Sequence, residues 1–159
     1  YNLTRAIGLC HGAIDAGYPG FDLWSAKVKR FNVGDVPVVP LEVPGGKVNT
    51  RVEATALIQR CSNLKGDLGI IAPPFHLVRA FMTTIAELKK TDIQLRVYAI
   101  PGVSVRWQDM VLHSQGKDRN TRAGFLESEF WRIDEYGAPE FGGMPTVQDM
   151  EAYLDWRDS

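Results

Sequence analysis

The sequence predicts an α/β protein with a Rossmann-like parallel sheet of about four strands, flanked by helices and followed by C-terminal helices. Short apolar runs alternate with amphipathic stretches of helical spacing from residue 5 to residue 100. One run, residues 68–72, is apolar almost throughout, as in a strand buried on both faces of a parallel sheet. Strands that alternate with helices favour right-handed crossovers and a doubly wound sheet.

Turn residues separate the expected elements. Strands are expected at residues 5–10, 36–41, 68–72 and 93–100, and helices at residues 21–31, 54–64, 78–88, 121–136 and 146–156. Pro37 and Pro40 make the second strand an edge or irregular strand, because proline cannot donate to a sheet ladder. Residues 103–120 show no periodicity and are expected to form a long loop. The whole chain, residues 1–159, is expected to form a single domain.

Composition and charge exclude several classes of protein. Of the 159 residues, 45% are hydrophobic and 23% are charged, which is typical of a globular chain. The formal net charge is -1, so nucleic-acid binding is not expected. No apolar run approaches the roughly 20 residues that a membrane helix needs, so membrane insertion is not expected either. Cys10 and Cys61 are too few for a disulfide framework or a zinc site of their own. We expect a cytoplasmic protein without a metal site, of open oligomeric state.

All three histidines fall where the expected parallel strands end. His11 follows the first strand, His76 follows the third, and His113 lies in the loop after the fourth. In open α/β sheets, ligands bind beyond the carboxyl ends of the strands, near helix N-termini. The placement predicts a shared small-molecule site, or else a coincidence of three scattered residues.

The segment 72–80 carries the most specific signal. His76 and Arg79 are three residues apart, so both share one face if they lie in a first helical turn. An imidazole and a guanidinium beside a helix N-terminus make an anion clamp. Because an imidazole exchanges protons near neutral pH, His76 is the candidate catalytic acid or base. The structural alternative is that His76 caps the turn and Arg79 pairs with a surface carboxylate.

Residues 49–53 also allow two interpretations. Thr50 and Glu53 fit a capping box, in which each side chain binds the other's backbone N–H. That role needs no ligand, whereas Asn49, just outside the helix, is expected to face one, and Thr50 is also a candidate ligand-binding residue. Thr146 and Asp149 resemble the same cap at the last helix and are interpreted as structural only.

The remaining candidate ligand-binding residues lie in loops. His11 and Gly12 follow the first strand, and His113, Ser114 and Gln115 lie in the long loop, which serves either as a lid or as a surface connection. Cys10 is expected to be a small buried residue, because neighbours in a strand point to opposite faces and a Cys10–His11 dyad is therefore poor. The sequence shows no Walker loop, no G-x-G-x-x-G, no nucleophile elbow, and no evident nucleophile.

The motifs in residues 5–136 resemble those of a bacterial family. The chain is similar to the YdcF/SanA/ElyC-like family through Asn49-Thr50, the strand at 68–72 and Phe75-His76-x-x-Arg79-Ala80. It is similar to the YdcF-like subgroup of that family through Tyr98-x-x-Pro101-Gly102, Trp107 and His113-Ser114-Gln115-Gly116. The resemblance implies a Rossmann-like sheet, a pocket lined by these residues, cell-envelope functions and a nucleotide or S-adenosylmethionine as ligand. The chain departs from the family in lacking the usual first strand–helix unit, and Glu53 lies farther from Asn49-Thr50 than the usual family glutamate.

Three functions remain open at this point. The first is an enzyme acting on a nucleotide-like or phosphorylated ligand, with Arg79 holding the anion, His76 moving protons, and Asn49 with His11 orienting the ligand. The second is a binding or regulatory module without turnover, linked to the cell envelope. The third is a scaffold protein with a vestigial site, which a large exposed apolar patch would favour.

Overall fold

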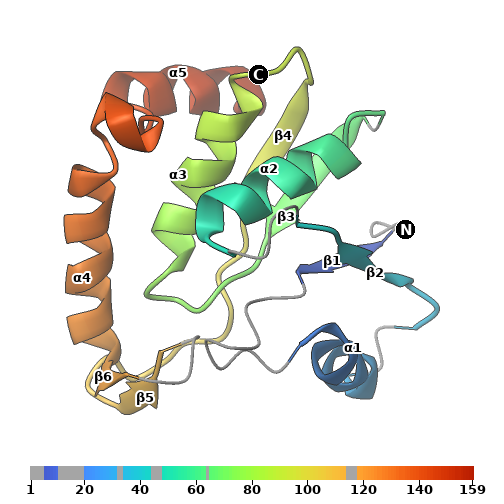
Figure 1. Ribbon diagram of the computed structural model, residues 1–159, viewed down its shortest axis with the longest axis vertical. Coiled ribbons are helices and arrows are strands. Elements are labelled where there is room, and N and C mark those ends of the chain that lie inside the picture. The colour runs from blue at the N-terminus through green and yellow to red at the C-terminus, as the bar shows by residue number, and fades with distance from the viewer. Residues whose placement is uncertain (1–5, 11–19, 32–33, 44–47, 64, 114–117) are drawn as a thin grey trace.

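The computed structural model describes residues 6–10, 20–31, 34–43, 48–63, 65–113 and 118–159 (Figure 1). The helices and strands follow the expected order. The strands are β1 Ile7–Cys10, β2 Val38–Leu41, β3 Gly66–Ile70, β4 Leu95–Ala99, β5 Met110–Leu112 and β6 Arg119–Thr121. The helices are α1 Phe21–Arg30, α2 Thr50–Arg60, α3 Leu77–Leu88, α4 Arg122–Glu135 and α5 Val147–Asp158, with a 3₁₀ turn, η2 Pro139–Phe141, before α5. The chain is therefore a mixed α/β protein, as predicted.

The four predicted parallel strands form two pairs. β1 pairs with β2 in parallel, with Ile7 opposite Val38, and β3 pairs with β4 in parallel, with Gly66 opposite Leu95. In the described part of the chain no ladder joins one pair to the other, so the continuous four-stranded sheet is not confirmed. The second strand carries Pro40 opposite Leu9, at a position where proline offers no N–H to a ladder.

Among the described residues, one face of the β3–β4 pair is buried and the other is largely exposed, which corrects the expectation of a strand buried on both faces. Leu95 and Val97 point inward and are buried, whereas Asp67 and Arg96 are exposed. Asp67 lies opposite Arg96 in the register, and the two form an ion pair at 2.9 Å. This alternation is typical of a sheet with one solvated face. Ile71, just after β3, is also exposed.

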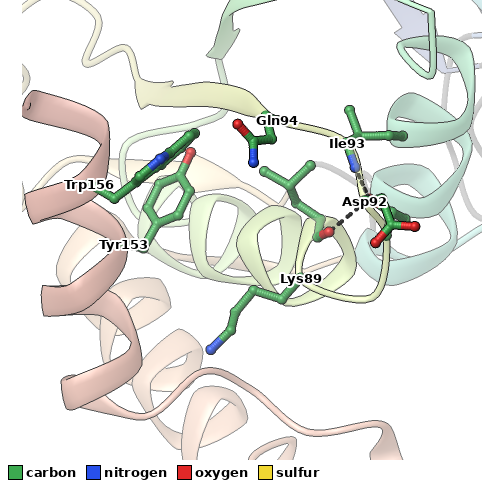
Figure 2. Close-up of a pocket in the computed structure, with 8 residues that line it drawn as sticks. Lys89, Asp92, Ile93, Gln94, Tyr153 and Trp156 are labelled. Carbon is green, nitrogen blue, oxygen red and sulfur yellow. Dashed lines mark hydrogen bonds between the residues drawn. The ribbon is translucent and has the colours of Figure 1, made fainter.

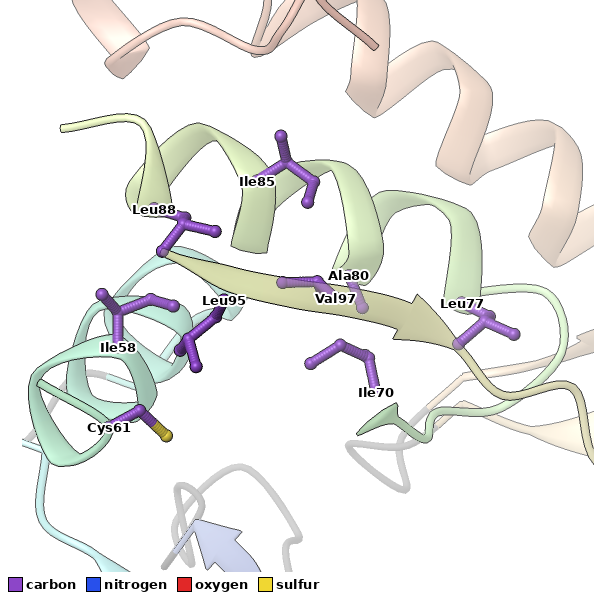
Figure 3. Close-up of a cluster of buried hydrophobic side chains, with 9 residues drawn as sticks. All are labelled: Ile58, Cys61, Ile70, Leu77, Ala80, Ile85, Leu88, Leu95 and Val97. Carbon is purple, nitrogen blue, oxygen red and sulfur yellow. The ribbon is translucent and has the colours of Figure 1, made fainter. Parts of the chain in front are cut away.

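The hydrophobic core lies between α2, α3 and the inner face of β3–β4. It contains Ile58 and Cys61 from α2, four side chains from α3, and three from the strands (Figure 3): Leu77, Ala80, Ile85, Leu88, Ile70, Leu95 and Val97. α2 packs along α3, and α3 contacts both strands and α4. α3 therefore lies between α2 and α4 (Figure 1). Cys61 is buried in this core, and burial raises the pKa of its thiol.

The outer edge of β4 is closed by α5. The hydroxyl of Tyr153 accepts a hydrogen bond from the Val97 N–H at 2.7 Å and donates one to the Leu95 carbonyl at 2.9 Å. Arg157 donates to the Val97 carbonyl at 3.2 Å. These bonds satisfy backbone groups of an edge strand that would otherwise be open to another chain. Within the described ranges, each helix is too short or too polar to span a lipid bilayer.

The segment predicted as a long loop, residues 103–120, contains a short antiparallel hairpin. β5 pairs with β6, with Met110 opposite Thr121 and Leu112 opposite Arg119. Each strand has three residues, which is too short for an alternation of apolar and polar residues to appear in the sequence. Thr121 ends the hairpin and caps α4, since its hydroxyl accepts from the Gly124 N–H at 3.0 Å.

Candidate functional site

A cluster of polar side chains joins the N-terminal ends of α2 and α3. Thr50 is the first residue of α2, His76 directly precedes α3, and Arg79 lies in the first turn of α3. Thr50 Oγ1 lies 3.4 Å from His76 Nε2 and accepts a hydrogen bond from Arg79 Nη1 at 3.0 Å. The imidazole and the guanidinium therefore lie on the same side of α3, as predicted, and both point toward one hydroxyl oxygen.

A buried carboxylate holds the opposite edges of these two groups. Glu129 of α4 is 1% exposed, and its Oε2 lies 2.8 Å from His76 Nδ1. Arg79 donates to Glu129 through both Nε and Nη2, and Arg132 donates to Oε1 at 2.7 Å. Three basic side chains thus surround one carboxylate. Two of them, His76 and Arg79, come from the start of α3, so their contacts with Glu129 attach α4 to α3.

The electrostatics of Glu129 keep it ionised. Burial raises the pKa of this carboxyl, but the hydrogen bonds and positive charges of His76 and Arg79 outweigh burial and lower its pKa from 4.5 to about 2. An ionised carboxylate only accepts hydrogen bonds, and so the contact with His76 requires a proton on Nδ1. Arg79 Nη2, 3.2 Å from the same nitrogen, is then a close neighbour and not a donor to it. In the neutral imidazole, Nε2 carries the lone pair and faces Thr50.

The cap of α2 explains why the Thr50 hydroxyl can reach the cluster. Asn49 is the N-cap residue, and its Oδ1 accepts hydrogen bonds from the N–H groups of Arg51 and Val52, both at 3.0 Å. Thr50 is inside the helix, so the predicted capping box of Thr50 and Glu53 is wrong. Asn49 has a structural role, and its predicted contact with a ligand stays a prediction.

The capping box predicted at the last helix is confirmed. The Thr146 hydroxyl accepts from the Asp149 N–H at 3.1 Å, and the Asp149 carboxylate accepts from the Thr146 N–H at 3.0 Å. This pair lies at the N-terminus of α5 and is structural, as its sequence suggested.

Glu53 and Cys10 border the cluster on the side of β1. Glu53 lies one turn after Thr50 on α2, and its carboxyl interacts with the Cys10 thiol at the carboxyl end of β1. Burial raises the pKa of Glu53, although the Cys10 hydrogen bond and the charges of His76 and Arg79 oppose this. Cys10 is half-buried and in contact with a carboxyl group, so the expectation of a purely packing role for it is wrong.

His113 lies at the end of β5, near the same cluster. Its ring packs against Phe125 at 5.3 Å and Phe75 at 6.2 Å between centroids. Burial lowers the pKa of His113, and the charge of Arg132 lowers it further. The structure thus brings His113 close to His76, as predicted, but through aromatic packing. Its neighbours Ser114 and Gln115, and His11 with Gly12, lie outside the described residues.

The purely structural interpretation of the His76–Arg79 pair is wrong in its details. His76 makes no side-chain cap at the start of α3, and the carboxylate that pairs with Arg79 is buried and not on the surface. The side chains of His76 and Arg79 are 17% and 12% exposed, so a small part of each reaches solvent.

Glu129 and Arg132 were not identified as site residues from the sequence, although a signal was present. Glu129 follows Phe125 by four residues, which places it on the same face of α4 as a buried phenylalanine. Arg132 follows Glu129 by three, so the two can pair on that face. A carboxylate at an apolar-face position indicates a buried ionic partner.

Two hollows open elsewhere on the molecule. One, of about 370 Å³, lies between the end of α3 and α5, where Lys89, Asp92 and Gln94 surround it with Tyr153 and Trp156 (Figure 2). Two of its polar side chains are engaged, since Lys89 pairs with Asp149, and Thr91 binds the Leu88 carbonyl. The other, of about 470 Å³, is apolar and lined by Trp107, Ala123, Leu126, Glu127 and Phe130. Neither is lined by His76 or Arg79.

The cluster consists of an imidazole, two guanidinium groups and a hydroxyl around one carboxylate. Among the described residues, no three histidine, cysteine or carboxylate side chains are grouped so that they could hold a metal ion. Comparison of the chain with protein-family models, with curated proteins and with solved structures finds no match. The resemblance to the YdcF-like subgroup therefore stays a prediction. Thr50, His76, Arg79 and Glu129 form the candidate functional site.

Proposed function

We propose that this chain is a small-molecule-binding protein whose ligand presents a phosphoryl or similar anionic group to Thr50, His76 and Arg79. The observation that carries the proposal is the convergence of His76 Nε2 and Arg79 Nη1 on Thr50 Oγ1, at 3.4 and 3.0 Å, beside the N-termini of two helices. Helix N-termini and guanidinium groups both favour anions.

Glu129 supports this role because it holds His76 and Arg79 by the edges that face away from Thr50. It binds Nδ1 of His76 and the Nε and Nη2 atoms of Arg79, whereas Nε2 and Nη1 face Thr50. One carboxylate is set against two guanidinium groups, those of Arg79 and Arg132. Glu53 also borders the cluster, and because burial raises the pKa of its carboxyl, its neutral form leaves excess positive charge that attracts an anionic group.

The identity of the ligand follows from the family resemblance. A YdcF-like protein is expected to bind a nucleotide-like molecule or S-adenosylmethionine, in the cytoplasm or in connection with the cell envelope. In this proposal the β1–β2 and β3–β4 pairs are the two halves of a Rossmann-like arrangement, with the ligand at their carboxyl ends. Either an enzyme or a regulatory module without turnover fits the site.

Calorimetric titration with ADP, S-adenosylmethionine and inorganic phosphate tests the proposal. We expect saturable binding of at least one of the three to the unaltered chain. Arg79→Lys removes the planar fork while keeping the charge, and Thr50→Val removes only the hydroxyl, so each should weaken binding at least about tenfold, or about 1.4 kcal/mol.

Arg96→Lys is the matched control, because it makes the same exchange at an exposed ion pair on the solvated face of β4. Its affinity should equal that of the unaltered chain. Equal affinities in Arg79→Lys, Thr50→Val and Arg96→Lys would contradict the proposed site.

A scaffold or interaction protein is the second candidate function, favoured by the apolar surface of α4. Phe130 and Trp131 are 54% and 63% exposed, and Phe130 lines the apolar hollow together with Trp107. Exposed aromatic side chains beside a hollow are typical of protein-binding surfaces. In this role the cluster around Glu129 only attaches α4 to α3, and none of the three ligands would bind.

A further inference from the structure

The polar cluster contains a hydroxyl, an imidazole and a carboxylate in sequence. Thr50 Oγ1 lies 3.4 Å from His76 Nε2, and His76 Nδ1 lies 2.8 Å from Glu129 Oε2. This order of groups activates a hydroxyl nucleophile in unrelated folds, where it is identified by geometry and not by sequence position. A hydroxyl-to-base distance above 3.2 Å is common before a substrate is bound.

We propose that Thr50 is a nucleophile that accepts a phosphoryl group from a phosphate ester, with His76 as its general base and Glu129 as the residue that positions His76. The proposal rests on the function proposed above, because it takes the anionic ligand of that site as the substrate. It assigns a catalytic role to a threonine for which the sequence predicted a helix cap or a contact with the ligand.

The direction of proton transfer follows from the contacts of Glu129. The carboxylate accepts from Nδ1–H, and this fixes the tautomer in which Nε2 is unprotonated and faces the Thr50 hydroxyl. When Nε2 takes the proton of Thr50, the resulting imidazolium lies against a carboxylate that is 1% exposed. A buried negative charge stabilises the imidazolium more strongly than a solvated one would.

Arg79 stabilises the other product of that transfer. Its Nη1 donates to Thr50 Oγ1 at 3.0 Å, and therefore lies beside the oxygen on which negative charge develops. Asn49 carries the cap of α2, so the Thr50 hydroxyl is not needed to satisfy the first N–H groups of the helix. The hydroxyl keeps both of its contacts within the cluster.

The reaction balances with water as its only further reagent. Thr50 Oγ1 forms a bond to phosphorus as its proton moves to His76 Nε2, and the bond between phosphorus and the ester oxygen breaks. Nε2 then gives the proton to the departing alkoxide, and an alcohol leaves. In the second half, water attacks the phosphothreonine, its proton passes through Nε2 to Oγ1 as that oxygen leaves phosphorus, and inorganic phosphate is released.

Labelling with an alkyl fluorophosphonate tests the nucleophile directly. In this probe the phosphorus takes the place of the transferred phosphoryl group and fluoride is the leaving group. Peptide mass spectrometry should find the adduct on Thr50 of the unaltered chain. Thr50→Ser keeps the hydroxyl and should keep the label, whereas Thr50→Val should lose it.

Glu129→Gln tests whether Glu129 positions His76, because loss of a merely structural carboxylate would not change the labelling rate or its pH dependence in a folded variant. Labelling of this variant should be at least about tenfold slower, and the fall in labelling rate on acidification should move to lower pH, because the imidazolium has lost its counter-charge. Circular dichroism of each variant establishes that it is folded. An unchanged rate and pH profile in folded Glu129→Gln would overturn the positioning role of Glu129.

Parallel titration with ADP separates this proposal from the binding function on which it rests. Binding of ADP without any adduct on Thr50 would overturn the nucleophile and leave the binding site standing. An adduct on Thr50 without ADP binding would support the nucleophile and contradict a nucleotide as the ligand. Absence of both would overturn both proposals.

Discussion

Replacement of Glu129 by alanine is expected to lower the free energy of unfolding by about 3–5 kcal/mol at pH 7. The substitution removes the carboxylate from among His76, Arg79 and Arg132, whose side chains are 17%, 12% and 31% exposed. Largely buried basic groups that lose their partner keep their desolvation cost without compensation. Chemical denaturation at pH 7 measures the change.

Glu127→Ala is the control, because Glu127 is exposed and lies two residues earlier on α4. Its effect should stay within about 0.5 kcal/mol. A similar small effect for Glu129→Ala would contradict the buried ionic network.

The same carboxylate gives the stability a defined pH dependence. Its pKa in the folded chain is about 2, below the ordinary 4.5, because the bonds from His76 and Arg79 outweigh burial. The stabilisation is therefore fully present above about pH 5 and is lost as pH falls toward 2. The difference in stability between the unaltered chain and Glu129→Gln should shrink over that range. A difference that stays constant down to pH 3 would contradict the lowered pKa.

Replacement of Ile85 by alanine is expected to cost about 2–5 kcal/mol of stability. Ile85 is 0% exposed and belongs to the cluster of buried side chains that Figure 3 shows. Removing its side chain leaves a cavity between α3 and its neighbours, and Ile85→Val should cost only about 0.5–1.5 kcal/mol.

Val78 provides the comparison on the same helix, since it is 42% exposed. Val78→Ala should change the free energy of unfolding by less than about 0.5 kcal/mol, measured in the same denaturation experiment. Comparable losses in Ile85→Ala and Val78→Ala would show that this face of α3 is not the core.

The sequence predicted the order of the first elements because local patterns determined them. Helical spacing identified α2 and α3, and the apolar run near Leu68 identified β3, to within a few residues. The arrangement of the strands could not be predicted in the same way. Whether β1–β2 joins β3–β4 depends on contacts between distant segments, and Asp67 with Arg96 shows that the outer face of β4 is solvated.

Only part of the candidate site could be predicted, because local spacing determines some of its contacts and the packing of distant segments determines the others. His76 and Arg79 are close in sequence, and their shared helical face follows from their spacing. Glu129 lies 50 residues beyond Arg79, and its contact with that residue depends on how α4 packs against α3. The capping box of Thr50 was predicted wrongly because Asn49 and Thr50 are both good cap residues, and only the backbone shows that Asn49 is the cap.

The tautomer of His76 is the most direct test, because the general-base role of His76 requires Nε2 to face Thr50 with its lone pair. Long-range ¹⁵N–¹H correlation spectra of the imidazole groups, assigned with His76→Gln, distinguish the two ring nitrogens in the neutral form. We expect the proton of His76 on Nδ1, bound to Glu129, and a loss of that preference in Glu129→Gln. A neutral His76 that carries its proton on Nε2 would contradict the contact with Glu129 and the functional site built on it.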